Sequence, residues 1–290
     1  MFLCDTMVGV VSGTCCYEHS NFNMKKSLRC GLVEETLIPW MVYAMSMRER
    51  QPDWIIDECT PDTVFMVRQL QKWLGAHWSI ATWFLEPRDF GSPSSGQRRF
   101  SLLMNEARRF WNTPPPSPLD LFGASCELTA EAFYAAPDVV VQGALEAARR
   151  ALGFSPRDSA VTWRETLPCH HYQRLLAAEK EFQSGRLSIG DAHCLIYMSD
   201  QNVQFGFRTS SHSPRLLRRS SPWNFSLDRP QLKWEVLMQM GMPALEEPWI
   251  SFLETVEHDV RQEIAGNALH PTVFAAVFLC MLLAAGDMQP

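Results

Sequence analysis

The residues with the clearest chemical potential near the start of this chain are two adjacent cysteines, Cys15 and Cys16. They follow the apolar run "VVSG" and precede Glu18 and His19. A cysteine in such a place can be a small buried side chain, a metal ligand, half of a disulfide or a nucleophile, because its thiolate is strongly nucleophilic near neutral pH. A carboxyl group suited to acid–base chemistry, Glu58, ends a second apolar stretch, "DWIIDE". Each of these groups is therefore expected at the end of a strand.

The elements that would carry these groups are short strands and helices in alternation. Strands are expected at residues 6–13, 53–58, 78–85 and 100–104, and helices at 31–50 and 62–75. This alternation predicts an α/β fold with a parallel sheet. Groups that act on a ligand gather at the carboxyl ends of the strands in such sheets. The pattern therefore predicts that Cys16 and Glu58 meet at one edge of the sheet.

The composition is that of a globular protein with a sizeable core, since 46% of the 290 residues are hydrophobic and 20% are charged. The formal charge of −6 excludes a simple polybasic nucleic-acid binder but leaves room for a local cationic groove. The nine cysteines form no compact framework, and the N-terminus lacks the basic region of a secretory signal. We therefore expect reduced thiols and an intracellular protein, nuclear in a eukaryote, that is not secreted. The apolar stretch at 272–285 is too short to span a bilayer and predicts a buried helix, so no membrane partner is expected.

Two segments punctuate the chain and suggest its domain organisation. Residues 112–120, "NTPPPSPLD", have the composition of a linker, and residues 207–223 are rich in serine, proline and arginine. Helical patterns lie between them, notably at 138–153 and 172–185. We expect one catalytic part at residues 1–109, an inserted, mainly helical domain at 110–222, and a return to the catalytic part at 223–290.

Several separated stretches resemble motifs of the cytosine-5 DNA methyltransferases. "SGTCCYEHS" resembles that family's Gly-x-Pro-Cys nucleophile loop, with Cys16 on the cysteine and Cys15 in place of the proline. "PDWIIDECTP" is similar to the strand that ends in the family's Glu-Asn-Val loop, with Glu58 on the glutamate. "DFGSPSSGQRRFSLL" resembles the segment Phe-Gly-x-Pro-Gln-x-Arg-x-Arg, in which Arg98 falls on the last arginine.

Two later stretches extend this resemblance. "RPQLKWEVLMQMGMP" is similar to a late motif of the family, matching at Arg229, Glu235, Gly241 and Pro243. "IAGNALHPTV" resembles its closing Gly-Asn-Ala/Ser-Val-x-Pro motif, matching at Gly266, Asn267 and Ala268. The resemblance covers most of the chain outside 110–222, where the family's target-recognition domain would lie. It implies part of a methyltransferase-type, Rossmann-like sheet with an inserted domain.

The resemblance also implies methyl transfer from S-adenosylmethionine to carbon 5 of cytosine in DNA. Cys16 would attack carbon 6, Glu58 would meet nitrogen 3 as an acid, and Arg98 would hold the base. Gly266 and Asn267 would form one wall of the cofactor site. The target base must leave the stack, and phosphate contacts would come from Arg215, Arg218 and Arg219. The same base chemistry fits cytosine in RNA, which stays an open alternative.

The chain departs from the family most clearly at the cofactor loop. It contains no Phe-x-Gly-x-Gly turn, which in the family receives the methionine part of the cofactor. Other family positions have changed as well, at Cys59, Thr60, Ser94 and Gly96. Three arrangements stay open. The chain is a fragment, or it is a non-catalytic interaction module on a remnant fold, or a separate polypeptide or missing N-terminal segment supplies the cofactor half.

Two other kinds of site compete with this interpretation. Zinc-binding residue types gather in the middle of the chain, at Cys169, His170, His171, His193 and Cys194. Their spacing follows no usual finger pattern, so no metal is expected. His19 could also serve Cys16 as the base of a cysteine hydrolase, a mechanism that needs an orienting residue and an oxyanion hole as well. Nothing in the sequence selects those further groups.

Overall fold

The computed structural model describes residues 7–13, 34–61, 64–112, 114–155, 162–185, 195–197, 213, 222–243, 246, 248, 251 and 269–285. The chain forms two compact units. The first comprises Met1–Phe90, Gln97–Ser125 and Thr272–Pro290, and the second comprises Gly91–Gly96 and Cys126–Pro271. The first unit therefore extends past residue 109, and the second extends past residue 222, so the division differs from the expected boundaries.

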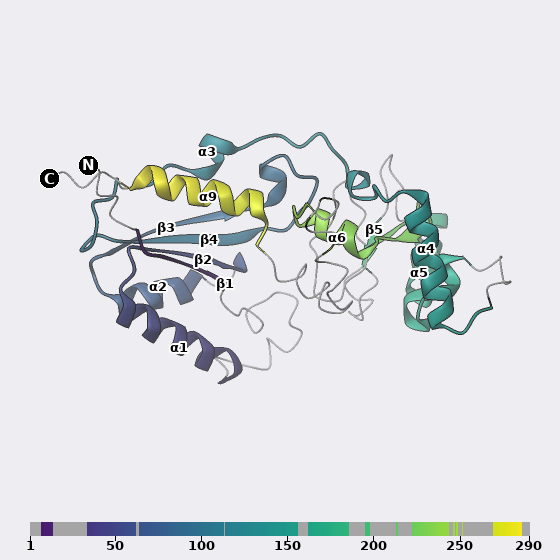
Figure 1. The fold of residues 1–290 in the computed structure, drawn as a ribbon, viewed down its shortest axis with the longest axis horizontal. Helices are drawn as coiled ribbons and strands as arrows, with labels where there is room; N and C mark the ends of the chain where they lie inside the picture. Colours follow the sequence, from purple (N-terminus) through teal and green to yellow (C-terminus); the bar gives the residue numbers. More distant parts are fainter. Residues whose placement is uncertain are drawn as a thin grey trace. The chain divides into compact units, whose positions relative to one another are not determined.

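A four-stranded sheet forms the centre of the first unit (Figure 1). Its strands are β1 (Gly9–Gly13), β2 (Trp54–Cys59), β3 (Trp78–Leu85) and β4 (Arg98–Asn105), in the order β1-β2-β4-β3. β1 and β2 are parallel, whereas β4 lies between β2 and β3 and is antiparallel to both. The predicted α/β class, with a sheet that contains parallel strands, is confirmed. The sheet as a whole is mixed because β3 and β4, consecutive in the chain, pair directly with each other.

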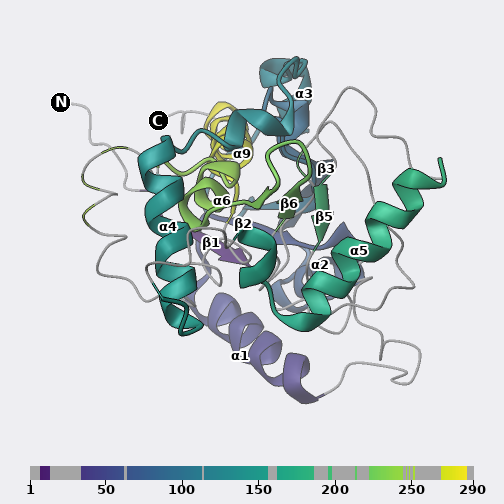
Figure 2. The same ribbon diagram turned by 90° about the vertical axis from the view of Figure 1, so that its right-hand side faces the viewer.

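Helices cover both faces of this sheet, and β1 lies between α1 and α9 in the turned view (Figure 2). α1 (Glu34–Arg50) and α2 (Val64–Leu74) lie on one face (Figure 1). The registers pair Val10 with Ile55 and Ile55 with Leu103, so these side chains form one row across three strands. Because successive strand residues point to opposite faces, this row meets the two helices in a shared apolar core.

α9 (Pro271–Ala284) lies on the opposite face of the sheet (Figure 1). The ring of Phe278 meets that of Trp54 edge-on, with centroids 5.7 Å apart. The helix contains no charged residue, and its outward Leu279 and Leu283 are 43% and 58% exposed. The helix expected to be buried is therefore buried on its sheet side alone. Among the helices that the structure describes, none combines the length and the apolar character needed to cross a membrane.

Gly9, the first residue of β1, allows a close approach to β2. It pairs with Trp54 in the parallel register. A Cβ atom at Gly9 would stand 1.9 Å from Cε2 of the Trp54 ring. No carbon atom can approach another so closely without a bond, so only glycine lets this ring lie against β1.

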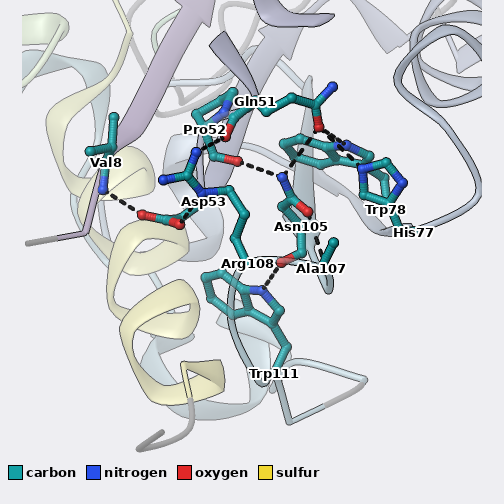
Figure 3. A network of polar contacts seen from close by, with 10 residues as sticks. All are labelled: Val8, Gln51, Pro52, Asp53, His77, Trp78, Asn105, Ala107, Arg108 and Trp111. Carbon is teal, nitrogen blue, oxygen red and sulfur yellow. Dashed lines mark hydrogen bonds and ion pairs between the residues drawn. The ribbon is translucent and has the colours of Figure 1, made fainter. Parts of the chain in front are cut away.

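A polar network holds the amino end of β2 (Figure 3). The carboxylate of Asp53 accepts a hydrogen bond from the backbone N–H of Val8 at 2.7 Å and lies 3.2 Å from Nε of Arg108. Asn105, at the end of β4, donates to the backbone carbonyl of Pro52 at 3.1 Å. These contacts join the starts of β1 and β2 to the end of β4. The candidate functional group Glu58 lies at the opposite, carboxyl end of β2.

The second unit combines helices with a small antiparallel sheet. Its helices are α4 (Asp138–Ala151), α5 (Cys169–Gln183) and α6 (Lys233–Gln239), and its strands are β5 (Leu195–Tyr197), β6 (Pro222–Asn224) and β7 (Arg229–Pro230). Among the described residues, the second unit also has 3-10 turns at Ala130–Phe133 and Trp163–Thr166, and the first unit has α3 (Pro118–Phe122) and a 3-10 turn at Pro87–Asp89. The helical patterns that the sequence shows at 138–153 and 172–185 are confirmed.

A buried ion pair joins β7 to α6 in the second unit. Arg229 donates to both carboxylate oxygens of Glu235, at 2.8 Å each. The same oxygens accept hydrogen bonds from the backbone N–H groups of Leu232 at 2.7 Å and Ala136 at 3.1 Å. The ring of Tyr134 lies 4.9 Å from the guanidinium carbon. Four donors therefore meet the charge of Glu235, whose side chain is fully buried.

Candidate active site at the carboxyl end of β2

The two catalytic candidates that the structure describes, Glu58 and Arg98, form an ion pair. Glu58 is the penultimate residue of β2, and Arg98 is the first residue of β4. Glu58 pairs with Phe100 in the antiparallel register, so Arg98 lies diagonally across from Glu58 on the same face. Nε of Arg98 is 2.7 Å from Oε1 of Glu58, and the side chains are 21% and 13% exposed. The pair is thus largely shielded from bulk water, and a small part of each side chain remains exposed.

The end of β1 lies beside the carboxyl group of Glu58. Gly13, the last residue of β1, pairs with Glu58 in the parallel register. An ideal Cβ atom at Gly13 would stand 3.7 Å from Oε2 of Glu58, which is an ordinary contact. The chain therefore leaves β1 toward Cys16 at a point next to this carboxyl group. Cys16 itself lies outside the described residues.

One hydrogen-bond donor of Arg98 has no partner among the described residues. This donor, Nη1, is buried. A buried donor without a partner costs about 1–3 kcal/mol, so a ligand oxygen that reached Nη1 would recover part of that free energy. The site offers a carboxyl group next to a cationic donor. This combination suits a planar ring that presents an amino group and a carbonyl oxygen.

A second ion pair, which the motifs did not single out, lies behind the first. Asp57 and Arg99 neighbour Glu58 and Arg98 along the same two strands and so point to the opposite face. Nη2 of Arg99 donates to Oδ2 of Asp57 at 2.5 Å, and the side chains are 0% and 2% exposed. The signal was present in the sequence, as two adjacent acids on one strand and two adjacent arginines on another. On paired strands, such dipeptides predict one ion pair on each face.

The buried carboxylate of Asp57 also connects β1 and α1 to this place. The hydroxyl of Ser12 donates to Oδ1 of Asp57 at 2.8 Å, and the hydroxyl oxygens of Ser12 and Tyr43 are 2.9 Å apart. Ser12 has one proton, which goes to Asp57, so Tyr43 donates to Ser12. Burial raises the pKa of Tyr43 well above its usual value, and the negative charge of Asp57 raises it further. Tyr43 therefore keeps its proton and its place in the network.

The other candidate site residues lie outside the described residues: Arg215, Arg218, Arg219, Gly266 and Asn267. Ser213, two residues before the arginine cluster, is described. Its backbone N–H donates to the carbonyl of Pro93 at 2.8 Å, and its carbonyl accepts from the N–H of Ser95 at 2.8 Å. This pairing, within the second unit, holds Ser213 to the loop Gly91–Gly96.

Gly241 and His270 bring two late segments together within the second unit. Gly241 has a φ of +74°, and a Cβ atom there would stand 3.0 Å from Cε1 of His270. Both ring nitrogens of His270 are buried and have no partner among the described residues. Burial lowers the pKa of His270 to about 4, because the charged ring would lose its hydration. The ring is therefore neutral near pH 7 and acts as a packing group.

No group of three histidine, cysteine or acidic residues suited to a metal ion occurs in the described part of the chain. Cys169 opens α5 as an exposed, free thiol, and the rings of His170 and His171 that follow have centroids 4.2 Å apart. The remaining members of that group, His193 and Cys194, lie outside the described residues. So does His19, the base of the hydrolase alternative, which stays a hypothesis from the sequence.

Comparison with known proteins shows a likeness of fold. No family model and no curated protein matches the sequence. Among solved structures, the chain is similar to an E. coli prophage protein assigned as a DNA modification methyltransferase, with a TM-score of 0.55 and 15% identity over 95% of this chain and 78% of that chain. It is also similar to the Entamoeba histolytica methyltransferase EhMeth (TM-score 0.50, 10% identity, 97% and 78% covered). A third likeness is to the S. pombe Dnmt2 methyltransferase (TM-score 0.50, 11% identity, 95% and 77% covered). At such identities the comparison shows the fold alone, which is of the methyltransferase type.

Proposed function

We propose that this chain transfers a methyl group from S-adenosylmethionine to carbon 5 of cytosine in DNA through a covalent cysteine adduct. The observation that carries the proposal is the ion pair of Glu58 and Arg98 beside the end of β1. The methyltransferase-type fold supports it, and so do the separated sequence motifs. The fold alone would not select cytosine. The carboxyl group of Glu58 lies next to a guanidinium donor. Gly13, which pairs with Glu58, precedes Cys16 by three residues, and this combination favours cytosine as the target.

The three catalytic residues have separate roles in this proposal. The thiolate of Cys16 adds to carbon 6 of cytosine, so the ring loses its aromaticity and carbon 5 becomes nucleophilic. Glu58 gives a proton to nitrogen 3 as electrons move there. Once carbon 5 carries the methyl group and the demethylated donor is free, carbon 5 would lose its proton to a base, the bond from Cys16 to carbon 6 would break, and nitrogen 3 would return its proton to Glu58. Arg98 donates to the carbonyl oxygen at carbon 2. Because Glu58 must carry a proton in the complex, base binding has to move the main contact of Arg98 from Glu58 to the base.

The cofactor would be held in part by residues that the resemblance assigns. S-adenosylmethionine, when bound, supplies the methyl group, and Gly266 and Asn267 would line its site. Both lie outside the described residues. A separate polypeptide, or a segment that precedes this chain, would supply the rest of the cofactor site.

DNA is the proposed partner, bound through its phosphates by Arg215, Arg218 and Arg219. Ser213, two residues before Arg215 in the sequence, is hydrogen-bonded to the loop Gly91–Gly96, and this supports a fixed chain position close to the arginines. Local arginines of this kind are compatible with a net charge of −6, since the field at a groove depends on where charges lie.

Covalent trapping on modified DNA tests the proposal. The purified chain is incubated with S-adenosylmethionine and a duplex that carries 5-fluorocytosine, whose fluorine blocks release of the enzyme. A second duplex carries 2-pyrimidinone, a more electrophilic ring that accepts the thiolate at carbon 6 without a methyl donor. We expect a denaturation-resistant adduct that maps to Cys16. It should disappear in Cys16→Ala and persist in the matched control Cys15→Ala, which removes the neighbouring thiol.

The two substrates separate the chemistry of this chain from its supply of cofactor. An adduct on 2-pyrimidinone alone would support the base chemistry and indicate that the methyl donor needs the additional segment. An adduct on the corresponding RNA in place of DNA would change the substrate to RNA. Absence of any adduct would refute methyl transfer and favour a non-catalytic interaction module.

A further inference from the structure

The two ion pairs where β2 meets β4 lie in different surroundings. The front pair, Glu58 and Arg98, keeps 13% and 21% of its side chains exposed. The rear pair, Asp57 and Arg99, is 2% and 0% exposed. Both pairs connect the same two strands at the same level, because each rear residue is the chain neighbour of a front residue. A change in the rear contact is therefore passed to the front pair across single peptide units about 3.8 Å long.

Stability alone does not account for a fully buried ion pair at this position. Taking two charges out of water costs several kcal/mol per ion, and apolar side chains of similar volume often stabilise such a site equally well or better. The rear pair instead provides a specific side-chain connection between β2 and β4. Its 2.5 Å contact joins β2 to β4, and the hydroxyls of Ser12 and Tyr43 extend the connection to β1 and α1.

We propose that Asp57 is a positioning residue for the front pair. Together with Arg99 and Ser12 it sets the strand offset at which Glu58 meets Arg98. The inference rests on the proposed function, in which the front pair receives the base. The strand offset matters because catalytic rates are sensitive to the positions of the reacting groups, and a misplacement of about 1 Å can lower a rate about 100-fold.

A double variant, Asp57→Leu with Arg99→Met, tests this inference. It removes both buried charges together, so no ion is left unpaired and the fold should persist. Thr82→Val is the matched control. It removes the 3.1 Å hydrogen bond between Thr82 and Ser101 on the same face of the sheet, away from β1. A purely structural role predicts that any folded variant keeps the front pair intact.

Three measurements decide between the two roles. Thermal unfolding reports the fold, and NMR exchange of the Arg98 Nε–H proton in arginine-labelled protein reports its contact with Glu58. Steady-state kinetics give kcat and KM for DNA. In the folded double variant we expect the Arg98 Nε–H proton to exchange about 10-fold faster and kcat to be about 10-fold lower. KM should be nearly unchanged, because positioning acts on the reacting geometry. Thr82→Val should match the wild type in all three.

Each outcome bears on one of the two proposals. Unchanged Arg98 exchange and kcat in the folded double variant would overturn the positioning role and leave the proposed function intact. A wild type that forms no adduct with either modified duplex would refute the proposed function, and Arg98 exchange alone would then decide the positioning role. If the double variant does not fold, Ser12→Ala takes its place. That change removes the hydroxyl that joins Asp57 to β1 and, through Tyr43, to α1, and it leaves the pair of Asp57 and Arg99 in place. It should still accelerate Arg98 exchange about threefold, as expected for loss of the hydrogen bond to Asp57.

Discussion

Replacement of Glu235 by alanine should destabilise the second unit severely. The side chain is fully buried, and its two oxygens accept four hydrogen bonds, two from Arg229 and one each from the N–H groups of Leu232 and Ala136. Removing one partner of a buried ion pair costs about 3–5 kcal/mol, because the other charge is left without compensation. Two backbone donors lose their acceptor as well. We expect a loss of about 5 kcal/mol in the free energy of unfolding, a large part of what a domain has.

Urea unfolding followed by tryptophan fluorescence measures this loss. Glu179→Ala is the matched control, since Glu179 also pairs with an arginine, Arg164, but both side chains are more than a quarter exposed. Arg164 also keeps its second partner, Asp228, at 2.7 Å. Exposed pairs contribute about 0–1 kcal/mol, so this variant should unfold near the wild-type midpoint. A loss below about 1.5 kcal/mol for Glu235→Ala, or one equal to that of the control, would contradict the reasoning from burial.

Three further predictions concern the sheet, a buried histidine and the candidate site. Gly9→Ala should lower the free energy of unfolding by about 1–3 kcal/mol, because its Cβ would overlap the ring of Trp54, whereas Gly13→Ala should be nearly neutral in the same thermal unfolding assay. His270 has its pKa lowered to about 4 in the folded chain, so unfolding takes up a proton below pH 6.5. Stability should therefore be full above pH 6.5 and fall by about 3 kcal/mol as the pH drops toward 4, and urea midpoints of His270→Gln should lack this slope. Glu58→Gln should slow adduct formation about 100-fold or more by removing the acid, with little change in DNA affinity by fluorescence anisotropy, and an unchanged rate would refute that role.

The strands of the first unit could be predicted from the sequence, because runs such as "WIID" and "FSLLM" bury both faces and stand between turn residues. Their order could not. Periodicity carries no direction, so it did not reveal that β4 inserts antiparallel between β2 and β3. The break seen in composition near residue 222 also falls inside the second unit, since a serine- and proline-rich stretch marks a loop wherever it occurs.

In the candidate site, too, some residues could be predicted from the sequence and others could not. Glu58 and Arg98 were selected by motif, and their 2.7 Å contact lies where alternation on paired strands allows it. Asp57 and Arg99 were missed because patterning assumes that charged residues face water. Only the pairing of β2 with β4 reveals that each charge has its opposite within reach.

The interleaved course of the chain has a practical consequence for any attempt to divide it. The backbone passes between the two units after residues 90, 96, 125 and 271. A protease that cuts at one of these junctions would release no intact half, because both pieces would still contain strands or helices that need the other piece to complete their unit. Nicked protein should therefore stay associated on a sizing column until a denaturant is added, and expression of either half as one continuous stretch should yield insoluble material.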